Sequence, residues 1–284
     1  MYFFLNVLRK GAAIAFAWLA LILNAAETPA KENYFEPVSM QTFVLAEALV
    51  KAQGMTTDGE HFFFSSNYGL IKTELDCETI VCQKLIAIPQ QLLELGCKHI
   101  GGITYYDGKI YCPVEDSKVF EHLYICTFDS ETLEFINAYP LPLEAHENGA
   151  PWCVADKERG VIYSARRDYP EVLNVYDAKT LEPLEPIKLT AAPHKVQGGE
   201  MYNGILYLSV SRNEQSVFAV NPDTGEVQVA FERNLFEGSE GEGMTILPTA
   251  DGALFHVMDI CSIRLATHVR HYAFNPESIK WELS

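Results

Sequence analysis

The sequence predicts an all-β protein built from repeats, and three features carry this prediction. One unit recurs five times, with a Gly-small apolar start, a tight turn and three further apolar strands. The strand candidates, such as HFFFSS, KIYCPV and ILYLSV, are rich in β-forming residues and too short for helices. Glycine and Asp or Asn recur at fixed places between them. Helical repeats are therefore excluded.

The five copies begin with similar segments. They read QGMTTDGEHFFFSSN, GGITYYDGKIYCPVED, GAPWCVADKERGVIYSARRD, GGEMYNGILYLSVSRN and EGMTILPTADGALFHVMD. Their first-turn glycines lie 44 to 52 residues apart, at Gly59, Gly108, Gly160, Gly204 and Gly252. A second turn follows in each copy, at Asp76, Asp129, Asp177, Asn221 and Asn275. Four strands at this spacing are the size of one β-propeller blade, so we predict five blades of four antiparallel strands.

The segment TFVLAEALVKAQ precedes the first copy and resembles the fourth strand of a blade. We expect it to close the ring against the last blade, which removes the exposed sheet edges. A sixth blade is the alternative, because the amino-terminal segment or the insertion CSIRLATHV has room for further strands.

The phrase FAVNPDTGEV resembles the strand–turn–strand unit of the YVTN, PQQ-type and SMP-30-like propeller families. This resemblance covers about a dozen residues in each blade and implies the fold alone. The SMP-30-like lactonases hold calcium with Glu, Asn and Asp. The matching loops here offer mainly His, so the lactonase analogy is loose.

The amino terminus predicts export. Residues 11–26 form an apolar stretch without charges, preceded by Arg9 and Lys10. This pattern is typical of a secretory signal, and an uncleaved signal anchor is the alternative. We therefore expect a signal segment over 1–26, a linker over 27–38 and one propeller domain over 39–284, in a secreted or periplasmic protein.

The charge balance limits the partners. The 38 acidic and 21 basic side chains give a net charge of −17. Such a surface repels phosphate, so nucleic acid is excluded, as is a membrane beyond an amino-terminal anchor. We expect a monomer that binds a small molecule or a protein.

Seven cysteines in an exported chain suggest disulfides, with at least one thiol left over. Cys77 and Cys82 flank the turn in DCETIVC, and two antiparallel strands would bring them close enough for a bridge. Buried free thiols are the alternative for Cys112, Cys126 and Cys153.

The face used for binding follows from loop length. The first-to-second and third-to-fourth connections of each blade are tight hairpins. The connections that lead into the first strand and those that join strands two and three emerge on the opposite side. They are longer and richer in polar groups. We call this side the loop face and expect the site there.

The connections that lead into the first strands suggest a metal site. They carry Gln53, His99, His146, His194 and Glu240 with Glu242. Three imidazoles and a carboxylate are suitable ligands for one divalent ion, zinc or calcium, which we place on His99, His146, His194 and Glu242. Hydrogen-bonded or solvated histidines are the alternative, because no HExxH or paired CxxC motif is present.

The connections between strands two and three carry possible anion-binding groups. Arginine grips a carboxylate or phosphate with two parallel hydrogen bonds. The candidates for ligand binding are Asn67, Asp116, Arg166, Arg167, Asp168, Arg212 and Asp259. Local pairing of these arginines with neighbouring carboxylates is the alternative.

Two functions follow. The first is a propeller that binds a ligand or partner on its loop face around the axis. The second is a metal-dependent hydrolase or lactonase, with Glu240 or Glu242 as the base. The sequence has no GxSxG motif and no repeated Trp motif, which disfavours a serine hydrolase and a quinone-dependent dehydrogenase.

Overall fold

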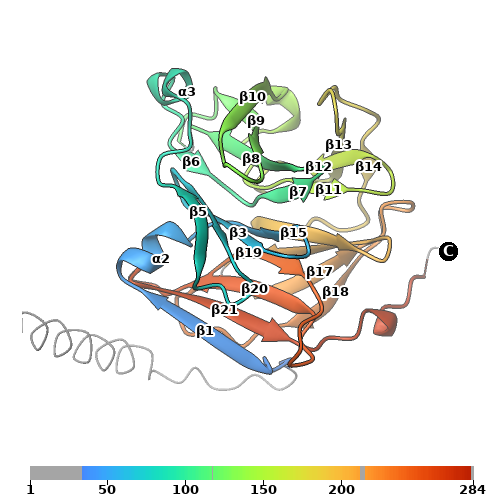
Figure 1. Ribbon diagram of the computed structural model, residues 1–284. Helices are drawn as coiled ribbons and strands as arrows, with labels where there is room; N and C mark the ends of the chain where they lie inside the picture. Colours follow the sequence, from blue (N-terminus) through green and yellow to red (C-terminus); the bar gives the residue numbers. More distant parts are fainter. Residues whose placement is uncertain (1–33, 117, 212–214, 283–284) are drawn as a thin grey trace, which may run out of the picture.

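The structure is a computed structural model that describes residues 34–116, 118–211 and 215–282. It confirms the predicted fold: five antiparallel four-strand blades form a ring (Figure 1). The predicted signal segment and most of the predicted linker lie outside the described residues. Over the part of the chain that is described, no helix is long and apolar enough to cross a membrane.

The first three blades follow the chain in order. Blade 1 contains β2 (Met55–Thr57), β3 (Phe62–Ser65), β4 (Leu70–Thr73) and β5 (Ile80–Lys84). Blade 2 contains β7 (Thr104–Tyr106), β8 (Lys109–Glu115), β9 (Leu123–Asp129) and β10 (Phe135–Pro140), with the short strand β6 (His99–Ile100) beside β8. Blade 3 contains β11 (Val154–Asp156), β12 (Val161–Ser164), β13 (Val172–Asp177) and β14 (Ile187–Lys188).

The last two blades complete the ring. Blade 4 contains β15 (Val196–Tyr202), β16 (Ile205–Val210), β17 (Ser216–Val220) and β18 (Val227–Glu232). Blade 5 contains β19 (Glu240–Ile246), β20 (Phe255–Ile260), β21 (Ala266–Tyr272) and β1 (Ser39–Val44). The helical pieces are α2 (Ala46–Val50), α3 (Gln90–Glu94), η1 (Leu143–Ala145) and η3 (Pro276–Ser278).

The five predicted first-turn glycines all lie in the turn between the first and second strands. Each has a positive φ, between 66° and 96°, which a residue with a Cβ rarely adopts. A Cβ there would meet no other atom, so glycine is required by the backbone angle and not by space.

The Asp and Asn residues of the second turn bind their own backbone. Oδ1 of Asp129 accepts a hydrogen bond from the amide of Thr132 at 2.8 Å, and Oδ1 of Asp177 accepts one from Thr180 at 2.9 Å. Asp76, Asn221 and Asn275 accept from an amide two or three residues on in the same way. These contacts turn the chain sharply, so the sequence pattern predicted the turns for a local physical reason.

The ring closes as predicted, because β1 supplies the outer strand of blade 5. It pairs with β21 along six residues, from Ser39 opposite His271 to Val44 opposite Ala266. In Figure 1 the blue strand lies beside the red-orange one.

Three details differ from the prediction. The predicted closing strand ends at Val44, and the next residues form helix α2. The predicted insertion at 261–269 is the turn between β20 and β21 together with the start of β21, and the described residues contain no sixth blade. Asn275 makes its turn, but no strand follows it, because β1 already occupies that edge of β21. Residues 280–282 instead contact blade 4 through Gln228 and Glu226.

The hydrophobic core consists of five clusters, each between two neighbouring blades. Successive residues of a strand face opposite sides, so the middle strands feed two clusters. In β3, for example, Phe63 packs toward blade 2 while Phe62 and Phe64 pack toward blade 5. Each blade is therefore held by both neighbours.

Glycines let the first strands approach the axis closely. A Cβ on Gly243 would lie 2.6 Å from Cα of Gly54, and one on Gly198 would lie 2.8 Å from Cα of Gly243. A Cβ on Gly101 would collide with the carbonyl of Pro151. These glycines therefore serve packing.

The structure contains no disulfide among the cysteines, and all seven are free thiols. The predicted bridge between Cys77 and Cys82 is therefore not supported. Cys77 is fully buried in the cluster between blades 5 and 1, whereas Cys82 packs against the cluster between blades 1 and 2. The two thiols lie on opposite sides of the blade. Burial raises the pKa of Cys77 to about 12, so this thiol is unreactive.

Candidate functional site

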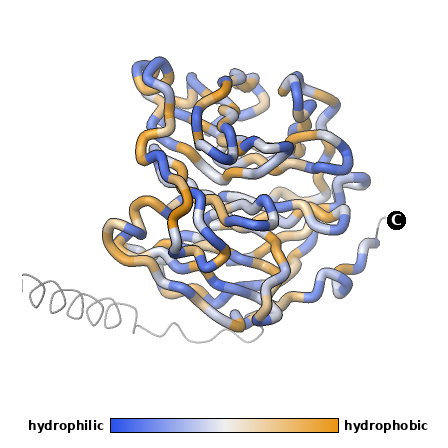
Figure 2. The backbone as a smooth tube through the Cα atoms, in the orientation of Figure 1, coloured by the Kyte–Doolittle hydropathy of each residue, from blue (hydrophilic) through white to orange (hydrophobic). Residues whose placement is uncertain are grey.

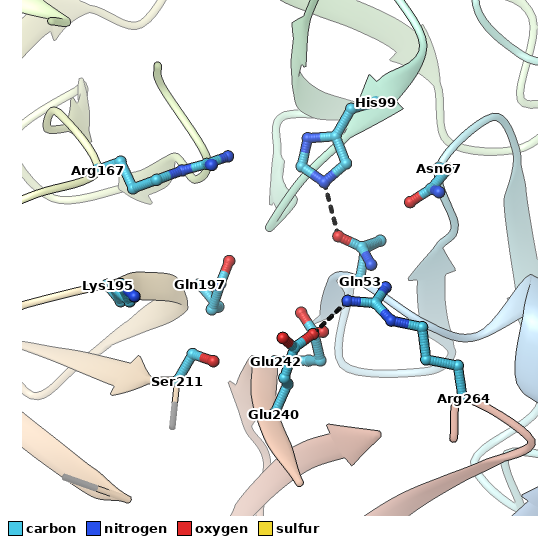
Figure 3. A pocket seen from close by; sticks show the side chains of 10 residues that line it. All are labelled: Gln53, Asn67, His99, Arg167, Lys195, Gln197, Ser211, Glu240, Glu242 and Arg264. Atoms are coloured by element: carbon cyan, nitrogen blue, oxygen red, sulfur yellow. Dashed lines mark hydrogen bonds and ion pairs between the residues drawn. The ribbon is translucent and has the colours of Figure 1, made fainter. Parts of the chain in front are cut away.

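A polar pocket of about 430 Å³ lies at the axis on the loop face (Figure 3). Its walls come from the connections that lead into first strands, from the first strands themselves and from the connections between strands two and three. The lining residues are Gln53, Asn67, His99, Arg167, Lys195, Gln197, Ser211, Glu240, Glu242 and Arg264. A volume of this size is usual for a small-molecule site.

His99 links one wall of the pocket to a buried carboxylate. Its Nε2 lies 2.7 Å from Oε1 of Gln53, and its Nδ1 lies 3.2 Å from Oε1 of Glu115. Gln53 donates its Nε2 to the carbonyl of Ala52, which fixes the orientation of the amide. The imidazole is thus held between the carboxamide of Gln53 and the carboxyl of Glu115.

Glu115 is 1% exposed and holds this wall together. Arg167 Nη2 lies 3.0 Å from Oε1, and the amide of Ala150 donates to Oε2 at 2.9 Å. Burial alone would raise the pKa of Glu115, but the contact with His99 and the charge of Arg167 outweigh it and lower that pKa. Glu115 is thus an anion that positions the Arg167 guanidinium and the His99 imidazole.

Two carboxyls of β19 form the opposite wall, in different surroundings. Glu240 makes an ion pair with Arg264 at 2.5 Å. Glu242 is 3% exposed, and its carboxyl has no hydrogen bond or ion pair with any described residue. Burial raises the pKa of Glu242 well above its usual value, and the charge of Glu240 adds to the rise. Burial therefore favours the protonated form of Glu242, which donates a hydrogen bond to an acceptor in the cavity.

Four further side chains line the cavity without hydrogen bonds or ion pairs to the described part of the protein. They are Asn67, Lys195, Gln197 and Ser211. Together they offer an ammonium, two amides and a hydroxyl. Polar groups that converge on a cavity without protein partners are the usual signature of a ligand site.

The pocket is locally positive in an acidic protein. Arg167, Lys195 and Arg264 line it with positive charge, against the ionised carboxylates of Glu240 and of Glu115 behind the wall. Glu242 adds no charge while it is neutral. The site is therefore suited to an anion or to a ligand with an oxyanion.

The structure does not bring the four predicted metal ligands together. His99 and Glu242 line the pocket, whereas His146 and His194 do not. His146 is fully buried, with its Nε2 2.6 Å from the Tyr176 hydroxyl. His194 stacks on Tyr169 with ring centroids 4.0 Å apart, and its Nδ1 lies 3.5 Å from Asp168. No cluster of three or more metal-binding side chains occurs in the described ranges.

The predicted ligand-binding residues divide into two groups. Asn67 and Arg167 line the pocket. The others that are described have partners elsewhere. Arg166 contacts Glu147 and the carbonyl of Tyr169, and Asp168 lies near His194. Asp116 accepts a hydrogen bond from the amide of Glu121, and Asp259 forms a buried ion pair with Arg270 at 2.6 Å. Arg212 lies outside the described residues.

Sequence reasoning missed four lining residues, namely Lys195, Gln197, Ser211 and Arg264. All four lie in connections that the sequence assigned to the loop face. The distance in sequence between the start of a first strand and the side chain that turns toward the axis differs by one or two residues among the blades. At blade 4 this offset selects Lys195, with φ of 57°, and not His194. The pairing of the strands fixes this offset. A sequence alignment of the five repeats that used the strand pairing would have identified Lys195.

A second buried carboxyl closes the axis on the hairpin side. Glu200 accepts hydrogen bonds from the hydroxyls of Thr56 at 3.2 Å and Thr245 at 3.0 Å. Burial raises the pKa of Glu200 to about 7, although Lys157 and both threonines oppose the rise. Thr56, Glu200 and Thr245 come from three first strands, so this group ties three blades together.

Comparison with known proteins supports the fold. The chain resembles the crystal structure of Myxococcus xanthus glutaminyl cyclase with a TM-score of 0.56 and 14% identity, over 82% of this chain and 94% of that one. A computationally designed protein, Ika8, matches with a TM-score of 0.38 and 10% identity, over 76% and 57% of the two chains. Neither a family model nor a curated protein sequence matches. At 14% identity the likeness to the glutaminyl cyclase shows the fold alone, and with the five blades seen here it places the chain among the β-propellers by architecture.

Proposed function

We propose that the protein binds a small molecule with a carboxylate or similar oxyanion in the axial pocket. The observation that carries this proposal is that Lys195 and Glu242 face the cavity without a described protein partner (Figure 3). An ammonium and a neutral carboxyl both donate hydrogen bonds, so together they complement an oxyanion. Asn67, Gln197 and Ser211 can satisfy the other polar groups of the ligand.

Isothermal titration calorimetry with succinate, glutarate and L-glutamate tests the proposal, with succinamide as the neutral control. We expect Lys195→Met to weaken binding of the acids about tenfold or more, because a charge-assisted hydrogen bond contributes roughly 1.5–3 kcal/mol. The matched control is Lys109→Met, which removes a lysine beside the first turn of blade 2 on the hairpin side. Equal affinity for acids and succinamide, or no effect of Lys195→Met, contradicts the proposal.

A second candidate rests on Glu242 and on the fold shared with a glutaminyl cyclase. In cyclisation of a glutaminyl residue, the α-amine nitrogen attacks the side-chain amide carbon, a lactam forms and ammonia leaves. A neutral carboxyl can protonate the departing amine and then accept a proton from the attacking one. Incubation with a Gln-Ala dipeptide, followed by mass spectrometry for loss of ammonia, tests this candidate. We expect activity in the wild type and its loss in Glu242→Gln.

Metal-dependent hydrolysis, the other function considered from the sequence, gains no support from the arrangement of the donors. His146 and His194 face away from the pocket toward Tyr176 and Tyr169. Elemental analysis of the purified protein checks this alternative: a stoichiometric metal lost in His99→Ala would favour it.

A further inference from the structure

Two segments beside the pocket residue Arg264 carry exposed apolar side chains, which we call the apolar lip. It consists of Val44, Leu45, Leu49, Ile263 and Leu265. These side chains are between 40% and 62% exposed. Single exposed leucines are common on protein surfaces, but five exposed large apolar side chains on two paired segments need an explanation.

The lip is held together by backbone contacts between two segments distant in sequence. The amide of Leu45 donates to the carbonyl of Leu265 at 2.9 Å, and the hydroxyl of Thr267 donates to the carbonyl of Ala48 at 3.2 Å. Figure 2 shows the helix α2 segment as strongly hydrophobic at the edge of the ring. The surface is therefore a fixed part of the fold.

The lip segments lead directly into residues that line the axial pocket. Arg264, which lines the pocket, lies between Ile263 and Leu265 in the chain. Gln53, which lies beside Arg264 in Figure 3, follows helix α2 after two residues. A molecule seated in the pocket and extending past Arg264 would therefore meet leucine and isoleucine side chains.

Building on the proposed function, we infer that the ligand is amphipathic, with an anionic head in the pocket and an apolar arm on the lip. The charge of the pocket selects the head, because Arg167, Lys195 and Arg264 outnumber the ionised carboxylates there. The lip removes part of the arm from water, which stabilises the complex in proportion to the apolar area covered. A ligand without the anionic head would leave the pocket empty, and a ligand without the apolar arm would leave the lip exposed to water.

A series of N-acylglycines, from acetyl to decanoyl and below their micelle concentrations, tests the inference by calorimetry. A methylene fully removed from water strengthens binding about fourfold, so we expect roughly twofold per methylene on this half-open surface. The double variant Leu49→Ser, Leu265→Ser should lose the dependence on chain length and keep its affinity for N-acetylglycine. Val229→Ser is the matched control, since Val229 is equally exposed but lies on the outer strand β18.

The outcomes separate the two proposals. If N-acetylglycine binds but longer chains bind no better, or the gain persists in the double variant, the lip does not hold an arm and the proposed anion site stands. If neither N-acetylglycine nor succinate binds, the proposed function fails and this inference fails with it. Sedimentation of the wild type with phosphatidylcholine vesicles, abolished in the double variant, would assign the lip to a bilayer and overturn the inference.

Discussion

Glu242 and Glu200 lie at opposite ends of the same axis, and their surroundings give them different roles. Glu200 is enclosed by Thr56 and Thr245 and bridges blades. Glu242 faces the cavity, its carboxyl has no hydrogen bond or ion pair with a described residue, and burial raises its pKa. A ligand with a hydrogen-bond acceptor would pair with this carboxyl, which is why Glu242 is central to the proposed site.

The first prediction concerns the pH dependence of anion binding. As the pH rises through the raised pKa of Glu242, the carboxyl ionises and repels an anionic ligand, so wild-type affinity for succinate should fall on the alkaline side. Glu242→Gln stays neutral, so its affinity should change less over the same range. Calorimetry over a series of pH values above the usual pKa of a glutamate measures the difference. Parallel curves for the two proteins would show that Glu242 does not contact the ligand.

Strand β1 is the element on which ring closure depends. Phe43 is 2% exposed and packs between blades 5 and 1, with its ring centroid 6.5 Å from that of Phe64. Met40, in the same strand, is 43% exposed. One strand therefore offers both a residue that holds the closure and a residue that does not.

The second prediction uses this pair. Phe43→Ala should lower the free energy of unfolding by about 3–5 kcal/mol, because it leaves a cavity at the closure. Met40→Ala should change it by less than about 0.5 kcal/mol. Urea denaturation followed by circular dichroism measures both. A small effect of Phe43→Ala would mean that the ring holds without its closing strand.

Elements that neighbouring residues determine were predictable from the sequence. Elements that depend on contacts with residues far away in the sequence were not. The turns follow from a glycine with positive φ or from an Asp that binds the next amides, and a single sequence shows both. Helix α2 replaced the end of a predicted strand because β21 stops pairing at Ala266, which the local sequence does not reveal. His146 and Lys195 were misjudged for a similar reason, since a shift of one residue in a connection decides which side chain reaches the axis.

At the scale of the whole molecule, buried titratable groups lower the free energy of unfolding both at acidic and at alkaline pH. On the acid side, burial lowers the pKa of both His146 and His256 to about 4. The unfolded chain takes up these protons near the usual pKa of about 6.5, before the folded protein does. Stability from these residues is complete above that value and is lost as the pH falls toward 4.

The third prediction tests this acid limb. His146→Gln keeps a hydrogen-bonding group for the Tyr176 hydroxyl but cannot be protonated. Between pH 7 and pH 4.5, the free energy of unfolding of the variant should fall less than that of the wild type, by a difference on the order of 3 kcal/mol. Its melting temperature should accordingly fall less over the same range. His122→Gln, at a partly exposed position, serves as the control. An unchanged pH profile in His146→Gln would contradict the assignment.

The fourth prediction concerns the alkaline limb, where Glu200 acts. Its pKa is about 7 in the folded protein and about 4.5 in the unfolded chain. The unfolded chain therefore loses this proton first, so the contribution of Glu200 to stability is complete below pH 4.5 and is lost as the pH rises through 7. Glu200→Gln should match the wild type at pH 5 and unfold at a higher temperature at pH 8. A lower melting temperature than the wild type at both pH values would contradict this role.

The pairing of β1 with β21 also affects how the chain can fold as it is made. Val44 leaves the ribosome about 230 residues before Tyr272, which at ordinary synthesis rates is a delay of roughly 10 to 45 s. Throughout that interval β1 has a free edge, and any other strand that meets it competes with its proper partner. Blade 5 is thus completed by the earliest of the described strands, and the ring can close only after β21 has been synthesised.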